Sequence, residues 1–409
     1  MNIFSFGNLP VILDGATGTE LIKRGLHQGV CVEKWIIDNE STITDVQKNY
    51  FSSGSDCVYA ATFGANRAAL KKYSLENSVE DINLKLVSLS KSVSDKLLIG
   101  GDLSPTGKML LPYGDTELEE MIDIYRQQAK ALEKANVDFF AIETMMSLAE
   151  ARAAVIAVKE VSDKPIIVTM TVEASGKTMN GNSVLACLCT LQEMGISAFG
   201  LNCSVSPQQI LDLLIEASPY AKIPLIAKPN AGVPTADGQT KQLSPDDFAD
   251  FAKKAIQNGI GILGGCCGTS PDHIKAIKNT VSSLEYKRPI LDSTAQIILT
   301  TQKSAFFLSE DFNKSEIFKC TDDLPENILD AEDDGCDVFC VEINSQEDIE
   351  IFESYSYMFN LPVYIITDSI ELLEKVAQGF CGRIMVESND SLDAVKLEAL
   401  TQKYGIIVF

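Results

Sequence analysis

The segment Ile260-Gly261-Ile262-Leu263-Gly264-Gly265-Cys266-Cys267-Gly268 decides the fold. Its first half is a continuous apolar run, which is typical of a strand buried on both faces of a parallel sheet. Its second half is a glycine-rich turn that carries two adjacent cysteines where the strand ends. We therefore predict a buried strand over 260–263, followed directly by residues with the backbone freedom and the side chains to form a site.

Seven similar apolar runs precede this segment, each separated from the next by the length of a strand-helix unit. Each run ends in a polar or glycine-rich segment, and in a barrel all these ends meet at one rim. The runs predict an α/β protein in which residues 1–285 form a (β/α)8 TIM barrel. An open, doubly wound sheet is the alternative, because a number of strands does not show closure. The eight runs are residues 11–13, 57–60, 97–99, 139–142, 166–168, 198–201, 225–227 and 260–263.

Helical hydrophobic patterns fill the intervals, for example over 118–134 and 147–161, where Ser147 and Glu150 have the spacing of a capping box. After about residue 281 the character changes, and residues 290–409 predict a smaller α/β domain, too short for a second barrel. Its expected strands are 305–308, 338–343, 363–366, 383–386 and 406–409, and its expected helices are 325–334, 346–358, 369–378 and 391–403.

The composition is that of a globular protein, since 45% of the 409 residues are apolar and 22% are charged. The net charge of −23 argues against nucleic-acid binding through the phosphate backbone. No apolar run is long enough to span a membrane, and the first ten residues lack the features of a secretory signal. Eleven cysteines without such a signal predict reduced thiols in the cytoplasm.

Three cysteines stand at predicted strand ends: Cys203 after the sixth strand, and Cys266 and Cys267 after the eighth. Zn²⁺ prefers sulfur in tetrahedral geometry, and three protein ligands leave its fourth position open, as in catalytic sites. Because three thiolates offset the charge of the metal, such a site suits activation of a substrate thiol better than activation of water. Buried packing is the alternative for each of the three, and it is our expectation for the other eight cysteines.

Six segments at the strand ends resemble, in the same order, motifs of the homocysteine S-methyltransferase family, most closely the homocysteine-binding module of cobalamin-dependent methionine synthase. The resemblance covers about residues 8–280, or about two thirds of the chain. The segments are Asp14-Gly15-Ala16-Thr17-Gly18-Thr19, Thr62-Phe63-Gly64-Ala65-Asn66-Arg67, Ile142-Glu143-Thr144-Met145, Gly200-Leu201-Asn202-Cys203-Ser204, Lys228-Pro229-Asn230-Ala231-Gly232 and Gly264-Gly265-Cys266-Cys267-Gly268-Thr269.

This resemblance implies a zinc-containing barrel in which Cys203, Cys266 and Cys267 are the metal ligands and the catalytic residues. It places the amino-acid site on Asp14, Gly15, Ala16 and Thr17 and on Glu143. A carboxylate of Asp14 or Glu143 is suited to the substrate ammonium group, and backbone N–H groups of the first loop are suited to its carboxylate. Asn202 and Asn230 either hydrogen-bond the substrate or hold the loops in place.

The activity that the resemblance implies is zinc-dependent methylation of homocysteine to methionine. Its methyl donor would be a methyl-corrinoid, such as methylcobalamin, on a partner protein, because 409 residues cannot hold the folate and cobalamin domains of the full enzyme. An S-methylmethionine or betaine-type donor stays open. The alternative from another class is a non-catalytic, thiol-binding accessory subunit of a corrinoid methyltransferase system.

Residues 330–390 also resemble part of a pterin-binding barrel, in the string Asp333-Asp334-Gly335-Cys336-Asp337-Val338-Phe339-Cys340-Val341-Glu342-Ile343-Asn344. Glu342 stands where that family favours aspartate, and half of the length is missing. We interpret residues 290–409 as a degenerate fragment of such a barrel, kept for packing or docking, and folate binding is the less favoured alternative.

Overall fold

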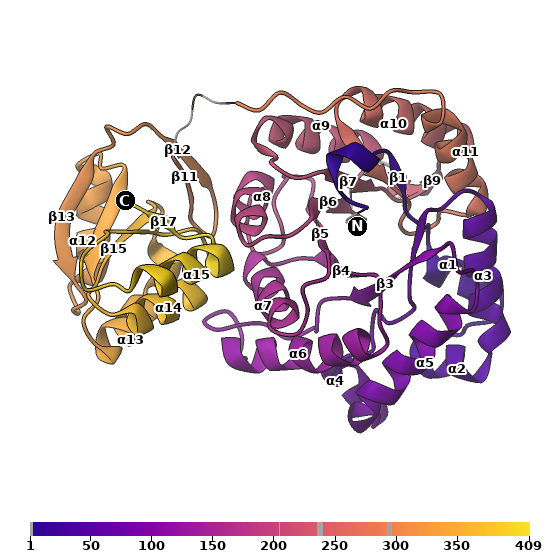
Figure 1. Ribbon diagram of the computed structural model, residues 1–409, viewed down its shortest axis with the longest axis horizontal. Helices are drawn as coiled ribbons and strands as arrows, with labels where there is room; N and C mark the ends of the chain where they lie inside the picture. Colours follow the sequence, from indigo (N-terminus) through magenta and orange to yellow (C-terminus); the bar gives the residue numbers. More distant parts are fainter. Residues whose placement is uncertain (1–2, 204, 235–239, 293, 295–296) are drawn as a thin grey trace. The chain divides into compact units, whose positions relative to one another are not determined.

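Eight parallel strands form one sheet in the order β1-β10-β7-β6-β5-β4-β3-β2 (Figure 1). The structure, a computed structural model, describes residues 3–203, 205–234, 240–292, 294 and 297–409, so Ser204 of the fourth motif segment lies outside it. The strands are β1 (Val11–Ile12), β2 (Cys57–Tyr59), β3 (Leu98–Leu103), β4 (Phe139–Met145), β5 (Ile166–Met170), β6 (Ala198–Asn202), β7 (Leu225–Lys228) and β10 (Ile260–Leu263).

The two end strands of this sheet, β1 and β2, are joined through Asp56, which immediately precedes β2. The Asp56 N–H donates to the Ile12 carbonyl at 2.7 Å, and the Asp56 carboxylate accepts the Ile12 N–H at 2.8 Å. The sheet is therefore a barrel, as predicted, and the open doubly wound alternative is wrong. The hairpin of β8 (Gly232–Pro234) and β9 (Thr240–Gln242) follows β7 and was not predicted.

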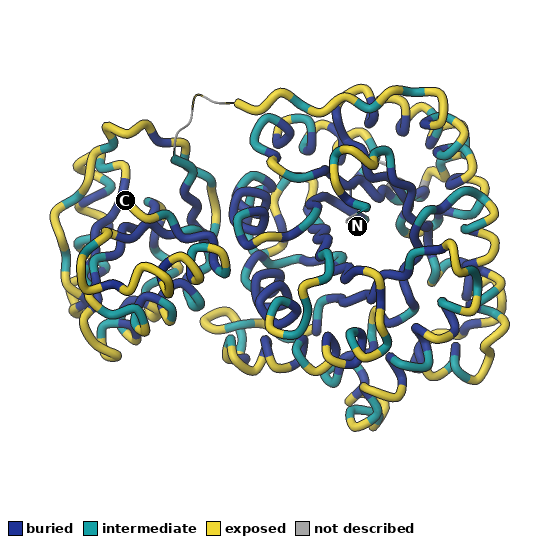
Figure 2. Tube along the Cα trace, viewed as in Figure 1, coloured by how far each residue is buried: buried dark blue, intermediate teal, exposed yellow. Residues whose placement is uncertain are grey.

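Helices surround this barrel, and their buried residues face inward (Figure 2). They are α1 (Thr17–Lys23), α2 (Val32–Asp38), α3 (Glu40–Ser52), α4 (Arg67–Leu70), α5 (Val79–Lys91), α6 (Leu118–Lys134), α7 (Leu148–Lys159), α9 (Pro207–Ala217), α10 (Pro245–Gln257) and α11 (Pro271–Val281). None of the helices in the described part of the chain combines the length and the apolar character needed to cross a bilayer.

The predicted capping box of α7 is half right. The Ser147 side chain accepts the Glu150 N–H, as expected of an N-cap. The Glu150 carboxylate does not return the bond, because it accepts instead from the Thr106 N–H, the Thr106 hydroxyl and the Tyr125 hydroxyl. Tertiary hydrogen bonds to a buried carboxylate thus replace the local one.

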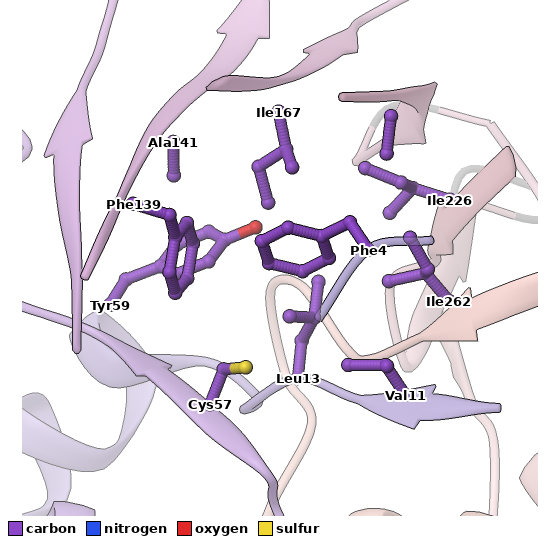
Figure 3. Close-up of a cluster of buried hydrophobic side chains, with 11 residues drawn as sticks. Phe4, Val11, Leu13, Cys57, Tyr59, Phe139, Ala141, Ile167, Ile226 and Ile262 are labelled. Carbon is purple, nitrogen blue, oxygen red and sulfur yellow. The ribbon is translucent and has the colours of Figure 1, made fainter. Parts of the chain in front are cut away.

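A cluster of apolar side chains fills part of the barrel interior (Figure 3). Phe4, from the segment before β1, packs edge-on against Phe139 at 4.9 Å between ring centroids. Gly100 gives this packing room, since a Cβ there would lie 2.5 Å from the Phe139 ring. The rest of the cluster is Val11, Leu13, Cys57, Tyr59, Ala141, Ile167, Ala198, Ile226 and Ile262. The barrel is therefore a packed core with polar interior side chains gathered toward the carboxyl ends of its strands.

The chain divides into two compact units, residues 1–179 with 196–290, and residues 180–195 with 291–409. By its contacts, α8 (Val184–Glu193), which connects β5 to β6 along the chain, belongs to the second unit. There it packs against the antiparallel hairpin of β11 (Ile297–Thr300) and β12 (Ala305–Leu308). The Thr190 and Thr300 hydroxyls share a hydrogen bond of 2.7 Å, and the Asn182 amide donates to the Gln302 carbonyl at 2.8 Å.

A parallel sheet of five strands forms the rest of the second unit, in the order β13-β14-β15-β16-β17. Since neighbours in the chain are neighbours in the sheet, right-handed connections place the helices on one face. Cys340 and Tyr364 lie on the other face and pack against Leu299 and Leu308 of the hairpin. The strands and helices are β13 (Lys314–Lys319), α12 (Leu324–Asp333), β14 (Val338–Glu342), α13 (Gln346–Ser354), β15 (Val363–Ile366), α14 (Ile370–Gly379), β16 (Met385–Val386), α15 (Ala394–Tyr404) and β17 (Ile407–Val408).

Candidate active site

A cavity of about 350 Å³ opens at the carboxyl ends of the barrel strands. Seven of the eight strands, or the loops that directly follow them, contribute to its wall. The wall includes the predicted residues Asp14, Gly15, Ala16, Thr17, Glu143, Cys203, Cys266 and Cys267, together with Tyr59, Asp102, Thr144 and Lys228, to which no role was given from sequence.

The three predicted cysteine ligands come together in this wall. The sulfur atoms of Cys203, Cys266 and Cys267 all lie within 4.8 Å of one another. Cys203 directly follows β6 in a left-handed conformation with φ of 62°, a strained geometry that is concentrated at functional sites. Both loops are anchored to the end of β7, because the Cys203 N–H donates to the Lys228 carbonyl at 3.1 Å and the Cys266 N–H donates to the Pro229 carbonyl at 2.8 Å.

This trio fits a zinc ion. Tetrahedral zinc with sulfur ligands at about 2.3 Å requires sulfur atoms about 3.8 Å apart, which small side-chain movements reach from the observed spacing. Hydrogen bonds with Cys203 and Cys267, and then burial, raise the pKa of the Cys266 thiol well above its usual value. The crowded thiols therefore favour a cation that allows all three to ionise together.

Asn202 and Asn230 contact the sulfur atoms and are not among the described residues that line the cavity. The Asn202 amide donates to the Thr144 hydroxyl at 2.8 Å and to the Cys266 sulfur at 3.7 Å, while its oxygen accepts the Thr144 N–H at 3.1 Å. The Asn230 amide donates to the Cys203 sulfur at 3.6 Å. These contacts are compatible with the predicted role in holding the loops, and the alternative role in hydrogen-bonding the substrate stays a prediction.

Thr269 ties the last loop to the first, and sequence reasoning assigned it no role. Its hydroxyl accepts the Ala16 N–H at 3.0 Å and donates to the Cys266 carbonyl at 2.7 Å. A Cβ on Gly15 or Gly265 would lie 2.8 or 2.4 Å from this hydroxyl, so both positions require glycine. The thiol-bearing loop and the predicted amino-acid loop are therefore held as one piece.

Lys228 is the one basic residue among the described residues that line the cavity. Its ammonium group lies 3.0 Å from the Glu143 carboxylate, 3.9 Å from the Asp14 carboxylate and 3.7 Å from the centroid of the Tyr59 ring. Burial alone would lower the pKa of Lys228, but Glu143, Tyr59 and Asp14 outweigh it and hold that pKa well above its usual value. Lys228 is therefore a buried, charged lysine among acidic groups.

The cavity is rich in carboxyl groups. Asp14 is 2% exposed and accepts the Tyr59 N–H at 2.9 Å. Burial raises the pKa of Asp14 to about 6, although Lys228 opposes the shift. Glu33 adds a further carboxylate, which accepts the Gly64 N–H at 2.9 Å. Glu143 and Lys228 directly follow predicted apolar runs, whereas two glycines separate Asp102 from the run before it.

In a comparison with known proteins, the family model for homocysteine S-methyltransferase matches residues 11–281 of this chain. Curated relatives include the methionine synthase of Mycobacterium tuberculosis, which is 30% identical over 68% of this chain and 25% of its own length. The methionine synthase of Mycobacterium leprae is 30% identical over 66% of this chain and 24% of its own length. The chain thus spans about a quarter of the length of these relatives.

Among solved structures, the metallated form of the homocysteine methyltransferase MmuM from Escherichia coli is similar in fold. It matches with a TM-score of 0.58 and 22% identity, over 66% of this chain and 95% of its own. The apo form of the same protein matches with a TM-score of 0.53 over the same shares of both chains. At this level of identity the likeness concerns the barrel fold.

Proposed function

The chain belongs to the homocysteine S-methyltransferase family, and on that basis we propose that it transfers a methyl group to the thiol of homocysteine, giving methionine. The observation that carries the proposal is the grouping of Cys203, Cys266 and Cys267 in the wall of a cavity. The same wall includes carboxyl groups and the glycine-containing first loop, which are suited to an amino acid. The methionine synthases that the chain resembles support the same reaction class.

Cys203, Cys266 and Cys267 would hold zinc, as the donor set and its spacing allow. Zinc supplies a Lewis acid that lowers the pKa of a substrate thiol, so that a thiolate is present near neutral pH. No general base is then needed for the methyl transfer itself. Asn202 and Asn230 donate to the sulfur atoms and hold two of the ligands in place.

The amino-acid part of the substrate would lie on the first loop. Thr269 already takes the Ala16 N–H, which leaves Gly15 and Thr17 to offer N–H groups that have no partner in the described part of the chain. These groups are suited to the substrate carboxylate, and the carboxylates of Asp14 and Glu143 are suited to its ammonium group. A zwitterionic aminothiol matches this division of donors and acceptors.

For the donor, we propose a methyl-corrinoid presented by a partner protein, since methionine synthases are among the relatives. A sulfonium donor such as S-methylmethionine, or a betaine-type donor, is the alternative. No disulfide bond joins any of the eleven cysteines, all of which lie in the described part of the chain, and this supports our proposal that the protein works in the reducing cytoplasm. For residues 290–409 we propose a role in packing or docking.

A donor panel tests this function. The full chain, loaded with zinc, is incubated with homocysteine and methylcobalamin, S-methylmethionine or betaine, and methionine is measured. We expect turnover with one donor class, loss of turnover in Cys266→Ser, and retention in the control Cys336→Ser, which changes a partly exposed cysteine of the second unit. Absence of turnover with every donor, together with stable binding to a corrinoid protein, would instead establish the accessory-subunit alternative.

A further inference from the structure

A second cavity, of about 640 Å³, lies between α6 and the segment that precedes α5. Its wall is formed by residues of α4, of the short 3-10 helices η2 (Lys71–Tyr73) and η3 (Glu76–Ser78), of the loop after β3 and of α6. Helices α4 and α6 lie side by side in Figure 1. Among the described residues, none lines both this cavity and the candidate active site, so a ligand here would bind at a separate place.

This second cavity is positively charged in a strongly acidic protein. The chain as a whole has 34 basic and 57 acidic residues. Of the described residues that line the cavity, five are basic and three are acidic, namely Glu76, Glu120 and Asp123. An excess of positive charge against the sign of the whole chain favours an anionic ligand. The five basic residues are Arg67, Lys71, Lys108, Arg126 and Lys130.

Three of these basic residues are already committed to other groups of the protein. Arg67 donates to the Asp123 carbonyl at 3.0 Å, and the Arg126 guanidinium group pairs with the Asp123 carboxylate. The Lys108 ammonium group lies 3.1 Å from the Glu120 carboxylate. These contacts neutralise two of the three acidic residues and hold the wall of the cavity in place.

Lys71 and Lys130 are in a different situation. Both are exposed, and within the described ranges neither ammonium group has an ion pair or a hydrogen bond. They come from different elements, Lys71 from η2 and Lys130 from α6. Two uncommitted ammonium groups around one cavity suit a ligand with two or more negative charges, because hydrogen bonds between charged groups are the strong ones.

Glu76 supplies a second, independent indication of a ligand. Its Oε2 atom is buried and has no hydrogen-bond partner in the part of the chain that the structure describes. A buried carboxylate oxygen without a partner is costly, and a hydroxyl group of a ligand would satisfy it. A ribonucleotide combines both features, since its phosphates are anionic and its ribose offers hydroxyl groups that carboxylates bind. The cavity volume is within the range of about 300 to 1,000 Å³ that is typical of small-molecule sites.

We propose that this second cavity binds a phosphorylated ribonucleoside. Its phosphate groups would lie at Lys71 and Lys130, and a ribose hydroxyl would donate to Glu76 Oε2. The proposal adds a ligand site to the barrel and does not depend on the methyl-transfer function. Because the two cavities share no lining residue among those described, the ribonucleotide and the aminothiol would bind side by side without competition.

Isothermal calorimetry on the full chain, in buffer without divalent cations, tests the proposal with adenosine diphosphate and inorganic pyrophosphate. In Lys71→Gln/Lys130→Gln we expect the affinity for both probes to fall about 10-fold or more. In Glu76→Gln we expect the preference for adenosine diphosphate over pyrophosphate, which lacks a ribose, to fall about 3-fold or more. The control Lys72→Gln/Lys253→Gln removes two exposed charges outside the cavity and should change both affinities less than about 2-fold.

Each contrary outcome overturns the proposal. Absence of binding of both probes at about 1 mM would show that the cavity takes no such anion. An equal loss in the lysine double variant and in its control would mean that exposed positive charge in general attracts the probes. An unchanged preference in Glu76→Gln would reject the ribose contact and with it the ribonucleotide class. Thermal unfolding checks the fold of each variant, and Lys71→Ser/Lys130→Ser is the second double variant.

Discussion

The Lys228 ammonium group and the Glu143 carboxylate form an ion pair of 3.0 Å inside the barrel, with side chains only 3% and 14% exposed. Lys278 and Asp56 form a pair of the same length, but these side chains are 36% and 34% exposed. Removing one partner of a buried pair leaves an uncompensated charge, whereas water screens the partly exposed pair. The two pairs therefore provide a matched comparison of buried and exposed electrostatics in one barrel.

Lys228→Met should lower the free energy of unfolding by about 3 kcal/mol, because it leaves Glu143 and Asp14 without their cation. Lys278→Met should cost about 1 kcal/mol or less. Urea unfolding of both variants at neutral pH measures the difference. Equal losses in the two variants would contradict the importance that we give to burial at Lys228.

Cys266→Ser should abolish stoichiometric zinc binding, because a hydroxyl replaces one of three thiolate ligands and is a poor ligand for this metal. Metal analysis of the purified full chain should find about one zinc per wild-type chain and less than about 0.1 in the variant. Cys336→Ser, in the second unit, should bind zinc like wild type. Full zinc occupancy in Cys266→Ser would reject the ligand assignment.

Asn202→Ala should weaken zinc binding about 10-fold or more without removing any ligand. Its amide contacts the Cys266 sulfur and, through two hydrogen bonds, holds Thr144, whose φ of 62° is unusual for a residue with a side chain. Competition with a chromogenic chelator measures the affinity. The control Asn258→Ala removes an exposed asparagine amide bond at the end of α10 and should leave zinc affinity unchanged. Wild-type affinity in Asn202→Ala would mean that the ligand positions do not depend on this side chain.

Stability should depend on pH through Asp14, whose pKa is raised from 3.8 to about 6 by burial. Between these values the folded protein holds a proton that the unfolded chain releases, so the Asp14 contribution is fully present at low pH and is lost as pH rises through 6. The limit of the effect is about 3 kcal/mol. The unfolding free energy of wild type relative to Asp14→Asn should therefore fall from about pH 4 to about pH 7.

A counterpart of opposite sign checks this assignment. Hydrogen bonds from Ser244 lower the pKa of the exposed Asp247. Its contribution is present at higher pH and is lost as pH falls, so wild type relative to Asp247→Asn should gain stability as pH rises. A flat or rising difference for Asp14→Asn would show that its carboxyl group is not buried in the folded protein as described.

The barrel was predictable because its strands are apolar on both faces and stand out as short runs. The limits of β3 and β4 were less accurate, since both strands continue past the apolar run into residues such as Asp102 and Glu143. These polar residues face the cavity, so the pattern that identifies a buried strand stops where the site begins. In the second unit, β13 was missed because Lys314–Lys319 is a largely exposed edge strand without an apolar run.

The grouping of the three cysteines could be predicted from sequence because strand ends in a barrel meet at one rim. The hydrogen bond and the ion pair that hold the surrounding loops and side chains in place could not. Thr269 and Ala16 are 253 positions apart, and a hydroxyl that bridges two loops leaves no local pattern in the sequence. Nor does a strand-ending lysine reveal which carboxylate it will pair with, since the partner of Lys228 is 85 positions away in the chain.

The second unit is built from two separate stretches of the chain, because residues 180–195 join residues 291–409. A single proteolytic cut near residue 290 cannot release that unit intact, since its helical piece would stay behind with the other fragment. If the chain ended there, the Asn182 amide would lose the Gln302 carbonyl as its acceptor. Thr190 would lose its hydrogen bond with the Thr300 hydroxyl. The two units thus alternate along the chain, and recombination that exchanged residues 291–409 alone would have to rebuild the surface that packs against α8.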